Sequence, residues 1–147
     1  MTSRHSLALQ LLGIAPLLIS GCGMSANKQA AESTATQLYK SISEKDWDAA
    51  LGLYAPEFFQ KMPKDQWRDI LMNVSKKLGD YKNRQLQTWN YRSYVGTDGN
   101  RQETTLKFQV QYQNGEATET LTFLGSEVPL KIAGHQINSP QLLLPDK

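Results

Sequence analysis

The sequence predicts an α+β domain in which the helices come first and an antiparallel sheet follows. From residue 31 to residue 79, apolar side chains recur every three or four positions, which is typical of helices with one buried face. From residue 85 to residue 137, apolar and polar side chains alternate, as they do in half-buried strands. Clusters of turn-forming residues at 96–100 and 114–115 divide that second region into short strands.

Three helices are expected before Gly79. The first is marked by apolar residues at i, i+3, i+4 and i+7, which are Ala35, Leu38, Tyr39 and Ile42. The second begins after Asp46, a candidate N-cap, and ends before Pro56. The third has Pro63 at its first position and Gly79 as its C-terminal cap. A short turn or helix is expected between the last two.

Four strands are expected after the helices. A first strand covers 85–95, and a second covers 104–113 with Leu106, Phe108, Val110 and Tyr112 on one face. Asn114-Gly115 then predicts a two-residue type I′ hairpin turn. On the return strand the corresponding face carries Ala117, Glu119, Leu121 and Phe123. A last strand covers 130–137, with Pro129 at its start or on an edge.

The first twenty-two residues differ from the rest of the chain. Arg4 and His5 precede thirteen uncharged residues at 7–19, a run too short for the roughly 20 residues that a membrane span needs. Such a run is typical of the apolar region of a secretory signal. It ends in Ile19-Ser20-Gly21-Cys22, and Cys22 is the only cysteine in the chain.

This ending resembles the lipobox of bacterial lipoprotein precursors, in which small residues precede a lipid-modified cysteine. The resemblance implies that Cys22 receives a diacylglycerol and that a peptidase cuts between Gly21 and Cys22. The resemblance also implies a protein of the cell envelope. Residue 23 is Gly, whereas an Asp there would favour retention in the inner membrane, so the expected location is the periplasmic face of the outer membrane. Two alternatives remain open: an ordinary signal peptide with a chance cysteine, and a cytoplasmic protein with a core cysteine.

The chain is therefore divided into a signal peptide (1–21), a lipidated Cys22 with a short tether (22–30), one domain (31–139) and a C-terminal tail (140–147). Removing 1–21 takes away Arg4 and no acidic residue, so the net charge falls from +2 to +1. Such a balance, without a basic cluster, argues against a nucleic-acid partner. No second apolar run reaches membrane-spanning length. The many aromatic residues favour a packed domain over disorder.

Residues 46–59 read DWDAALGLYAPEFF and resemble the second helix of NTF2-like (cystatin-like) domains, especially small secreted ones of unknown function. Trp67 in the following helix and the closing segment 131–137, KIAGHQI, extend the resemblance over 31–139. It implies a cone in which three helices pack on a curved antiparallel sheet of about four strands. Pro129-Leu130 departs from the family, which often has a tryptophan there. Because this fold carries enzymes and binding proteins alike, it does not imply an activity.

No residue of this chain matches the catalytic patterns of NTF2-like enzymes, so no catalytic residue is predicted. His135, the only histidine after the signal peptide, is interpreted either as a general base beside a carboxylate or as an ordinary strand residue. The residues expected to line an apolar pocket, or else to form the core, are Tyr39, Trp47, Tyr54, Trp67, Phe108, Phe123 and His135. With one histidine and no free thiol, neither a metal site nor a cofactor is predicted.

Trp89, Tyr91 and Tyr94 indicate an interaction surface, because strand alternation cannot turn all three inward. The favoured hypothesis is a lipid-anchored, non-catalytic domain that binds a protein partner, a small apolar ligand or a second copy of itself as a homodimer. One alternative is a pocket enzyme that uses a carboxylate and His135. Another is an accessory subunit of an envelope secretion or cell-wall complex.

Overall fold

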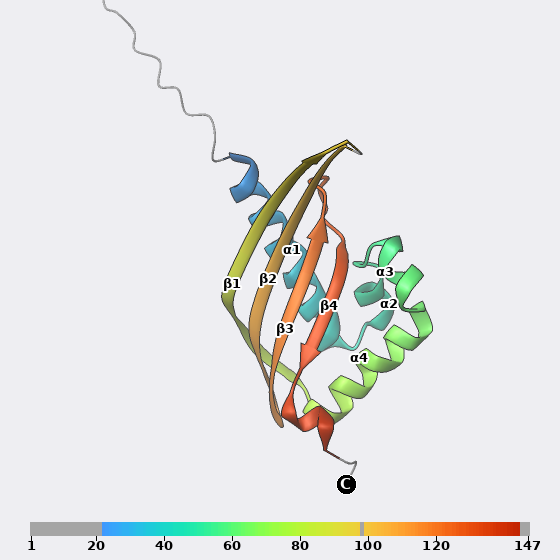
Figure 1. Ribbon diagram of the computed structural model, residues 1–147. Helices are drawn as coiled ribbons and strands as arrows, with labels where there is room; N and C mark the ends of the chain where they lie inside the picture. The colour runs from blue at the N-terminus through green and yellow to red at the C-terminus, as the bar shows by residue number, and fades with distance from the viewer. Residues whose placement is uncertain (1–21, 98, 145–147) are drawn as a thin grey trace, which may run out of the picture.

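A computed structural model of the chain describes residues 22–97 and 99–144 (Figure 1). The predicted signal peptide, with Gly21 at its cleavage site, lies outside the described residues, and so does the side chain of Cys22. The domain consists of helices followed by a four-stranded antiparallel sheet, which confirms the predicted α+β class. Among the described helices, none has the length and apolar character needed to cross a membrane.

From residue 22 onwards, four helices precede the sheet: α1 (Cys22–Glu44), α2 (Trp47–Leu51), α3 (Pro56–Lys61) and α4 (Lys64–Leu78). Asp46 caps α2 as predicted, because its Oδ1 accepts a hydrogen bond of 3.0 Å from the Ala49 amide. The short segment expected after Pro56 is the helix α3. Gly79 ends α4 with φ of 78°, a left-handed conformation that favours glycine.

Helix α1 begins at Cys22 and includes residues 22–30, the segment for which the sequence predicted a tether. Asn27 is buried here, and its Nδ2 donates to Gln102 Oε1 at 3.1 Å and to the Gly125 carbonyl at 3.4 Å. These contacts fix the first turns of α1 to the sheet. The residue to which the lipid is expected to attach therefore lies directly at the end of a packed helix.

The sheet contains β1 (Tyr81–Gly96), β2 (Gly99–Tyr112), β3 (Gly115–Leu124) and β4 (Ile132–Asn138), and the 3-10 helix η1 (Pro140–Leu143) follows it. Neighbouring strands pair antiparallel in the order β1-β2-β3-β4, which is a simple meander. The meander is open, being neither closed nor strongly curled. In Figure 1, α1 crosses one face of the sheet, whereas α2, α3 and α4 lie on the side of β4.

The hairpin between β2 and β3 differs from the prediction. Tyr112 pairs with Gly115, so Gln113 and Asn114 form the turn, and Gly115 does not have positive φ. The predicted type I′ turn centred on Asn114-Gly115 is therefore wrong. The cause is a tertiary contact: the Asn114 amide donates to the Leu78 carbonyl at 2.8 Å, and the Gln113 amide donates to the Asp80 carbonyl at 2.9 Å. The position of the turn is therefore set by its hydrogen bonds to the end of α4 and not by the local turn propensity of Asn114-Gly115.

The face of β2 and β3 that the alternation predicted to point inward is buried in full. The connection between α2 and α3 is joined to the start of β4, where the Ile132 amide donates to the Leu53 carbonyl at 3.0 Å and the Ala55 amide donates to the Ile132 carbonyl at 2.8 Å. Tyr54 lies between Leu53 and Ala55 in the chain, so these bonds hold it against the inner face of β4.

Candidate functional site

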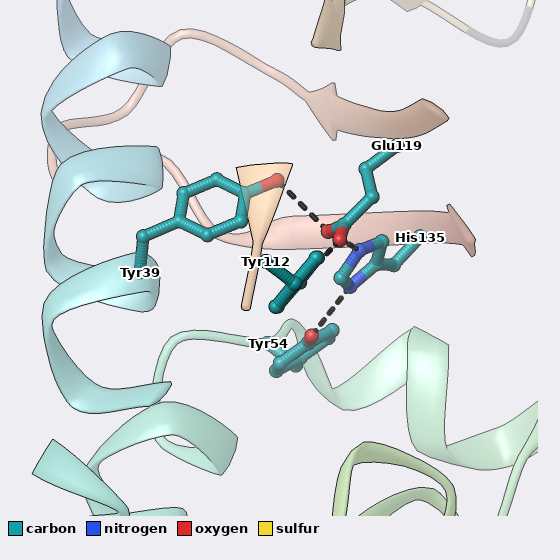
Figure 2. Close-up of polar contacts among 5 residues, drawn as sticks. All are labelled: Tyr39, Tyr54, Tyr112, Glu119 and His135. Atoms are coloured by element: carbon teal, nitrogen blue, oxygen red, sulfur yellow. Dashed lines mark hydrogen bonds and ion pairs between the residues drawn. The ribbon is translucent and has the colours of Figure 1, made fainter. Parts of the chain in front are cut away.

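A buried carboxyl group lies in the middle of the core. Glu119 occupies an inward position of β3 and has no solvent exposure. The Tyr39 hydroxyl donates to Glu119 Oε2 at 2.8 Å, and the Tyr112 hydroxyl donates to Oε1 at 2.5 Å. Figure 2 shows both hydroxyls directed at the carboxyl group. Each carboxyl oxygen is thus satisfied by a donor that is itself buried, as a buried carboxyl requires.

His135 extends this cluster towards the helices. Its Nε2 lies 3.0 Å from Glu119 Oε2, and its Nδ1 lies 2.8 Å from the Tyr54 hydroxyl (Figure 2). A neutral imidazole with its proton on Nε2 donates to Glu119 and accepts from Tyr54, whereas an imidazolium donates to both. Both the His135 and the Glu119 side chains have no solvent exposure. Every polar atom of the ring therefore has a protein partner.

The five residues Tyr39, Tyr54, Tyr112, Glu119 and His135 are called the Glu119 cluster below. They come from α1, from the segment after α2, and from β2, β3 and β4. The cluster thus joins the first helix, the helical connection and three strands through one carboxyl group and one imidazole. Buried networks of this kind specify a unique arrangement of the elements that they join, provided that each member is satisfied.

Aromatic side chains close the cluster on the side of the helices. The Trp67 ring lies edge-on to His135, with ring centres 5.4 Å apart, and also packs against Tyr54 at 5.9 Å. Phe58 lies 4.8 Å from Tyr54. The Trp67 Nε1 atom is buried and has no hydrogen-bond partner among the described residues. The imidazole is therefore enclosed by rings that offer it no further polar contact.

Burial shifts the titration of the three tyrosines. Burial raises the pKa of Tyr39, Tyr54 and Tyr112 above the usual value, and the nearby Glu119 carboxylate raises each one further. The charged phenolate is disfavoured because it would lose its hydration and would face another negative charge. All three hydroxyls therefore stay protonated and remain hydrogen-bond donors at neutral pH.

A carboxylate within hydrogen-bond distance of an imidazole has the geometry of a general acid–base pair. In this domain both groups are sealed. Hollows of about 360, 520 and 570 Å³ lie beside α4, between α1 and β1, and at the β1–β2 hairpin, and none of them is lined by Glu119 or His135. In this conformation the Glu119–His135 pair connects parts of the fold, and none of these three hollows gives a reactant access to it.

The residues that the sequence proposed for a pocket lie in or against the core. Tyr39, Tyr54 and His135 meet in the Glu119 cluster, and Trp67 covers it. Of the remaining three, Phe108 packs against Tyr39 with the two rings nearly perpendicular, Phe123 is fully buried and Trp47 is half-buried at the start of α2.

Glu119 itself was missed as a site residue, although the sequence carries a signal for it. It is the one acidic residue among the inward positions of a strand whose other inward residues are Ala117, Leu121 and Phe123. A carboxyl group at such a position needs buried donors, since an unpaired buried charge is strongly disfavoured. Searching for those donors would have pointed to the neighbouring Tyr112 and to His135.

The aromatic residues proposed for an interaction surface all lie on β1. Trp89 and Tyr94 are exposed, and Tyr91 is half-buried. Trp89 pairs with Leu106 across the strands, and the Lys28 ammonium of α1 lies 5.6 Å from its ring centre. Trp89 therefore borders α1, whereas Tyr94 lies close to the free end of the hairpin.

Comparison with models of protein families finds no family that matches this chain, and a search among characterised proteins finds no significant match. Within residues 22–97 and 99–144, no group of three or more histidine, cysteine, aspartate and glutamate side chains is placed to hold a metal ion. The candidate site is therefore defined by the geometry of the Glu119 cluster alone.

Proposed function

We propose that the protein is a lipid-anchored, non-catalytic domain of the cell envelope that acts by binding. Its target is a protein partner, a second copy of itself or a small apolar ligand. The observation that carries this proposal is the enclosure of the Glu119 cluster, whose acid and imidazole side chains are fully buried and hydrogen-bonded to protein. Within the described residues, the Glu119–His135 pair, which has the geometry of a general acid and base, thus holds the helices on the sheet.

The proposed anchor is supported by the N-terminal sequence. A basic start, an apolar run of thirteen residues and small residues precede the single cysteine of the chain. Lipidation would account for this lone Cys22, which has no partner for an internal disulfide. Two or more acyl chains hold a protein firmly on a membrane, whereas one chain gives only marginal binding. The proposed location is the periplasmic face of the outer membrane.

The proposed NTF2-like fold is supported by the order of elements, with helices first and a four-stranded antiparallel meander after them. The quoted motif at residues 46–59 provides both the cap of α2 and the buried Leu51 and Tyr54. Because folds of this kind carry many functions, the fold supports a binding role only together with the sealed cluster.

The proposal is tested on the mature lipoprotein, extracted in mild detergent and analysed by native mass spectrometry. Binding to itself or to a protein predicts twice the mass of the lipidated chain or a fixed larger complex. Binding of an apolar ligand predicts a retained addition that is lost on unfolding. A bare monomer that acquires no cross-linked neighbour in intact envelopes would contradict the proposal.

The rival hypothesis is an enzyme that uses Glu119 and His135, and the 3.0 Å contact between them favours it. It requires the aromatic rings over His135 to move so that a substrate can enter. The accessibility of His135 to a small reagent in the folded protein separates the two hypotheses.

A further inference from the structure

Several exposed apolar side chains gather at the end of the domain where α1 begins. The β1–β2 hairpin ends there, and it carries Val95 with 85% of its surface exposed. The connection between β3 and β4 reaches the same end and carries Val128, 76% exposed. Met24, in the first turn of α1, and Leu124, at the end of β3, are exposed as well.

Hydrogen bonds join these three segments at one end of the domain. Asn27 of α1 donates to Gln102 at the start of β2 and to the carbonyl of Gly125 in the β3–β4 connection. The Gly125 amide in turn donates to the Gln102 carbonyl at 2.8 Å. In Figure 1 the start of α1, the hairpin tip and this connection all lie at the top of the domain. The opposite end carries the turn at Gln113 and the helix η1.

We infer that this end of the domain rests against the lipid bilayer, with Val95 and Val128 entering the interfacial layer. The inference rests on the proposed lipid anchor at Cys22. Because α1 begins at Cys22 and is fixed to the sheet within two turns, the acyl chains would emerge beside these side chains. Attachment then keeps the bilayer at high effective concentration next to this end, and no other partner has that advantage.

The composition of the end fits a membrane interface. Tyr94, exposed next to Val95, has an aromatic ring and a hydroxyl group, a combination that is enriched at the boundary of lipid and water. The exposed Arg92 and Arg101 lie on the two strands of the hairpin, within reach of lipid phosphates. Among the residues that the structure describes at this end, the exposed acidic one is Glu127, which lies next to Val128 and limits how deeply the connection enters.

The role of this contact is orientation. The acyl chains already provide the binding strength, so a few apolar side chains add little to membrane affinity. They fix which way the domain points. With the end near α1 on the bilayer, the turn at Gln113 and the groove between α4 and η1 face away from the membrane.

The test uses the mature lipoprotein with one new cysteine, Val95→Cys or Val128→Cys. Since the lipid occupies the Cys22 sulfur, the new thiol is the only one that takes up an environment-sensitive dye. Gln113→Cys, exposed at the far end of β2, is the matched control. Each labelled protein is placed in vesicles of phosphatidylethanolamine and phosphatidylglycerol, and is then exposed to brominated lipid or to aqueous iodide.

The expected result is emission at shorter wavelength and quenching by brominated lipid at positions 95 and 128, with quenching by iodide alone at 113. If the protein floats with the vesicles but the labels at 95 and 128 are also quenched by iodide alone, the contact of this end with the bilayer is refuted, whereas the lipid anchor is not. A blue shift without quenching by brominated lipid would assign this end to a protein contact and would also overturn the inference. If the unsubstituted protein takes up dye at Cys22 and does not float, the anchor itself fails, and this inference fails with it.

Discussion

Tyr112 and Glu119 form the two ends of a 2.5 Å hydrogen bond inside the core, across the β2–β3 hairpin. The carboxyl group that receives this bond also receives one from Tyr39 and lies 3.0 Å from His135 Nε2. Two hydroxyl donors and one imidazole nitrogen, from three elements, thus converge on a single side chain. The consequences for stability are large, because each donor is left unpaired when that side chain is removed.

Glu119→Ala is expected to lower the free energy of unfolding by about 3 kcal/mol or more, since it leaves buried donors without an acceptor. The control is Glu116→Ala, which replaces an exposed residue of the same strand and is expected to change the free energy of unfolding by about 0.5 kcal/mol or less. Urea unfolding followed by tryptophan fluorescence measures both variants. Equal effects of the two substitutions would show that the cluster does not stabilise the fold.

Stability is expected to fall steeply above about pH 10, because the folded state raises the pKa of Tyr39, Tyr54 and Tyr112 above the unfolded value of about 10. There the unfolded chain releases these protons and the folded chain keeps them, so rising pH favours unfolding. Three such groups give a slope of about 4 kcal/mol per pH unit. Urea unfolding at a series of alkaline pH values measures this slope.

Tyr112→Phe removes one of these three groups and is expected to reduce the alkaline slope by about one third, to roughly 3 kcal/mol per pH unit. Tyr94→Phe, which replaces an exposed tyrosine of the hairpin, is the control and should leave the slope unchanged. A slope that is the same in Tyr112→Phe as in the unsubstituted protein would mean that Tyr112 ionises freely in the folded state.

Gly79→Ala is expected to destabilise the domain by about 3 kcal/mol. Alanine is strained at the positive φ of this position, and its Cβ would also crowd the neighbouring side chains. Gly79 has φ of 78°, and a Cβ there would lie 2.9 Å from the Gln113 Cβ and 2.9 Å from the side-chain nitrogen Nδ2 of Asn114. Gly99 also has positive φ, but a Cβ there meets nothing within 4 Å, so Gly99→Ala should cost about 1–2 kcal/mol. Thermal unfolding compares the two variants, and an equal loss would argue against close docking of the turn on α4.

Cys22→Ala is expected to abolish lipid attachment and cleavage between Gly21 and Cys22. The measurement is fractionation of cells, combined with mass spectrometry of the N-terminus. Ser25→Ala, three residues later in α1, is the control and should be processed normally. If the Cys22→Ala protein still matured at residue 22 and stayed with the membrane, the anchor would be ruled out.

The sequence predicts the elements of the fold well where local signals decide them. Gly79 marks the end of α4, and alternation identifies the buried face of β2 and β3. Pro63, which was expected at the first position of α4, lies one residue earlier as its N-cap. The β2–β3 turn could not be predicted in the same way. Its position depends on hydrogen bonds from Gln113 and Asn114 to the end of α4, which are distant contacts that a local propensity does not contain.

The candidate site was only partly predictable. Tyr39, Tyr54 and His135 were proposed together because they were aromatic or titratable residues of one predicted interior. Their connection was missed, since it runs through Glu119, which the pattern treated as one more position of a strand. Spacing alone shows which face a residue occupies. It does not show which side chains from five separate segments of the chain meet at one point.

The reactivity of His135 towards diethyl pyrocarbonate shows whether the Glu119–His135 pair of this domain is closed to solvent. His135 is the only histidine of the sequence after His5, so peptide mass spectrometry can follow this one ring. We expect His135 to stay unmodified in the folded protein and to react fully once urea unfolds it. Modification of the folded protein at the rate of a free imidazole would show an open site, and would contradict the non-catalytic proposal in favour of an enzyme.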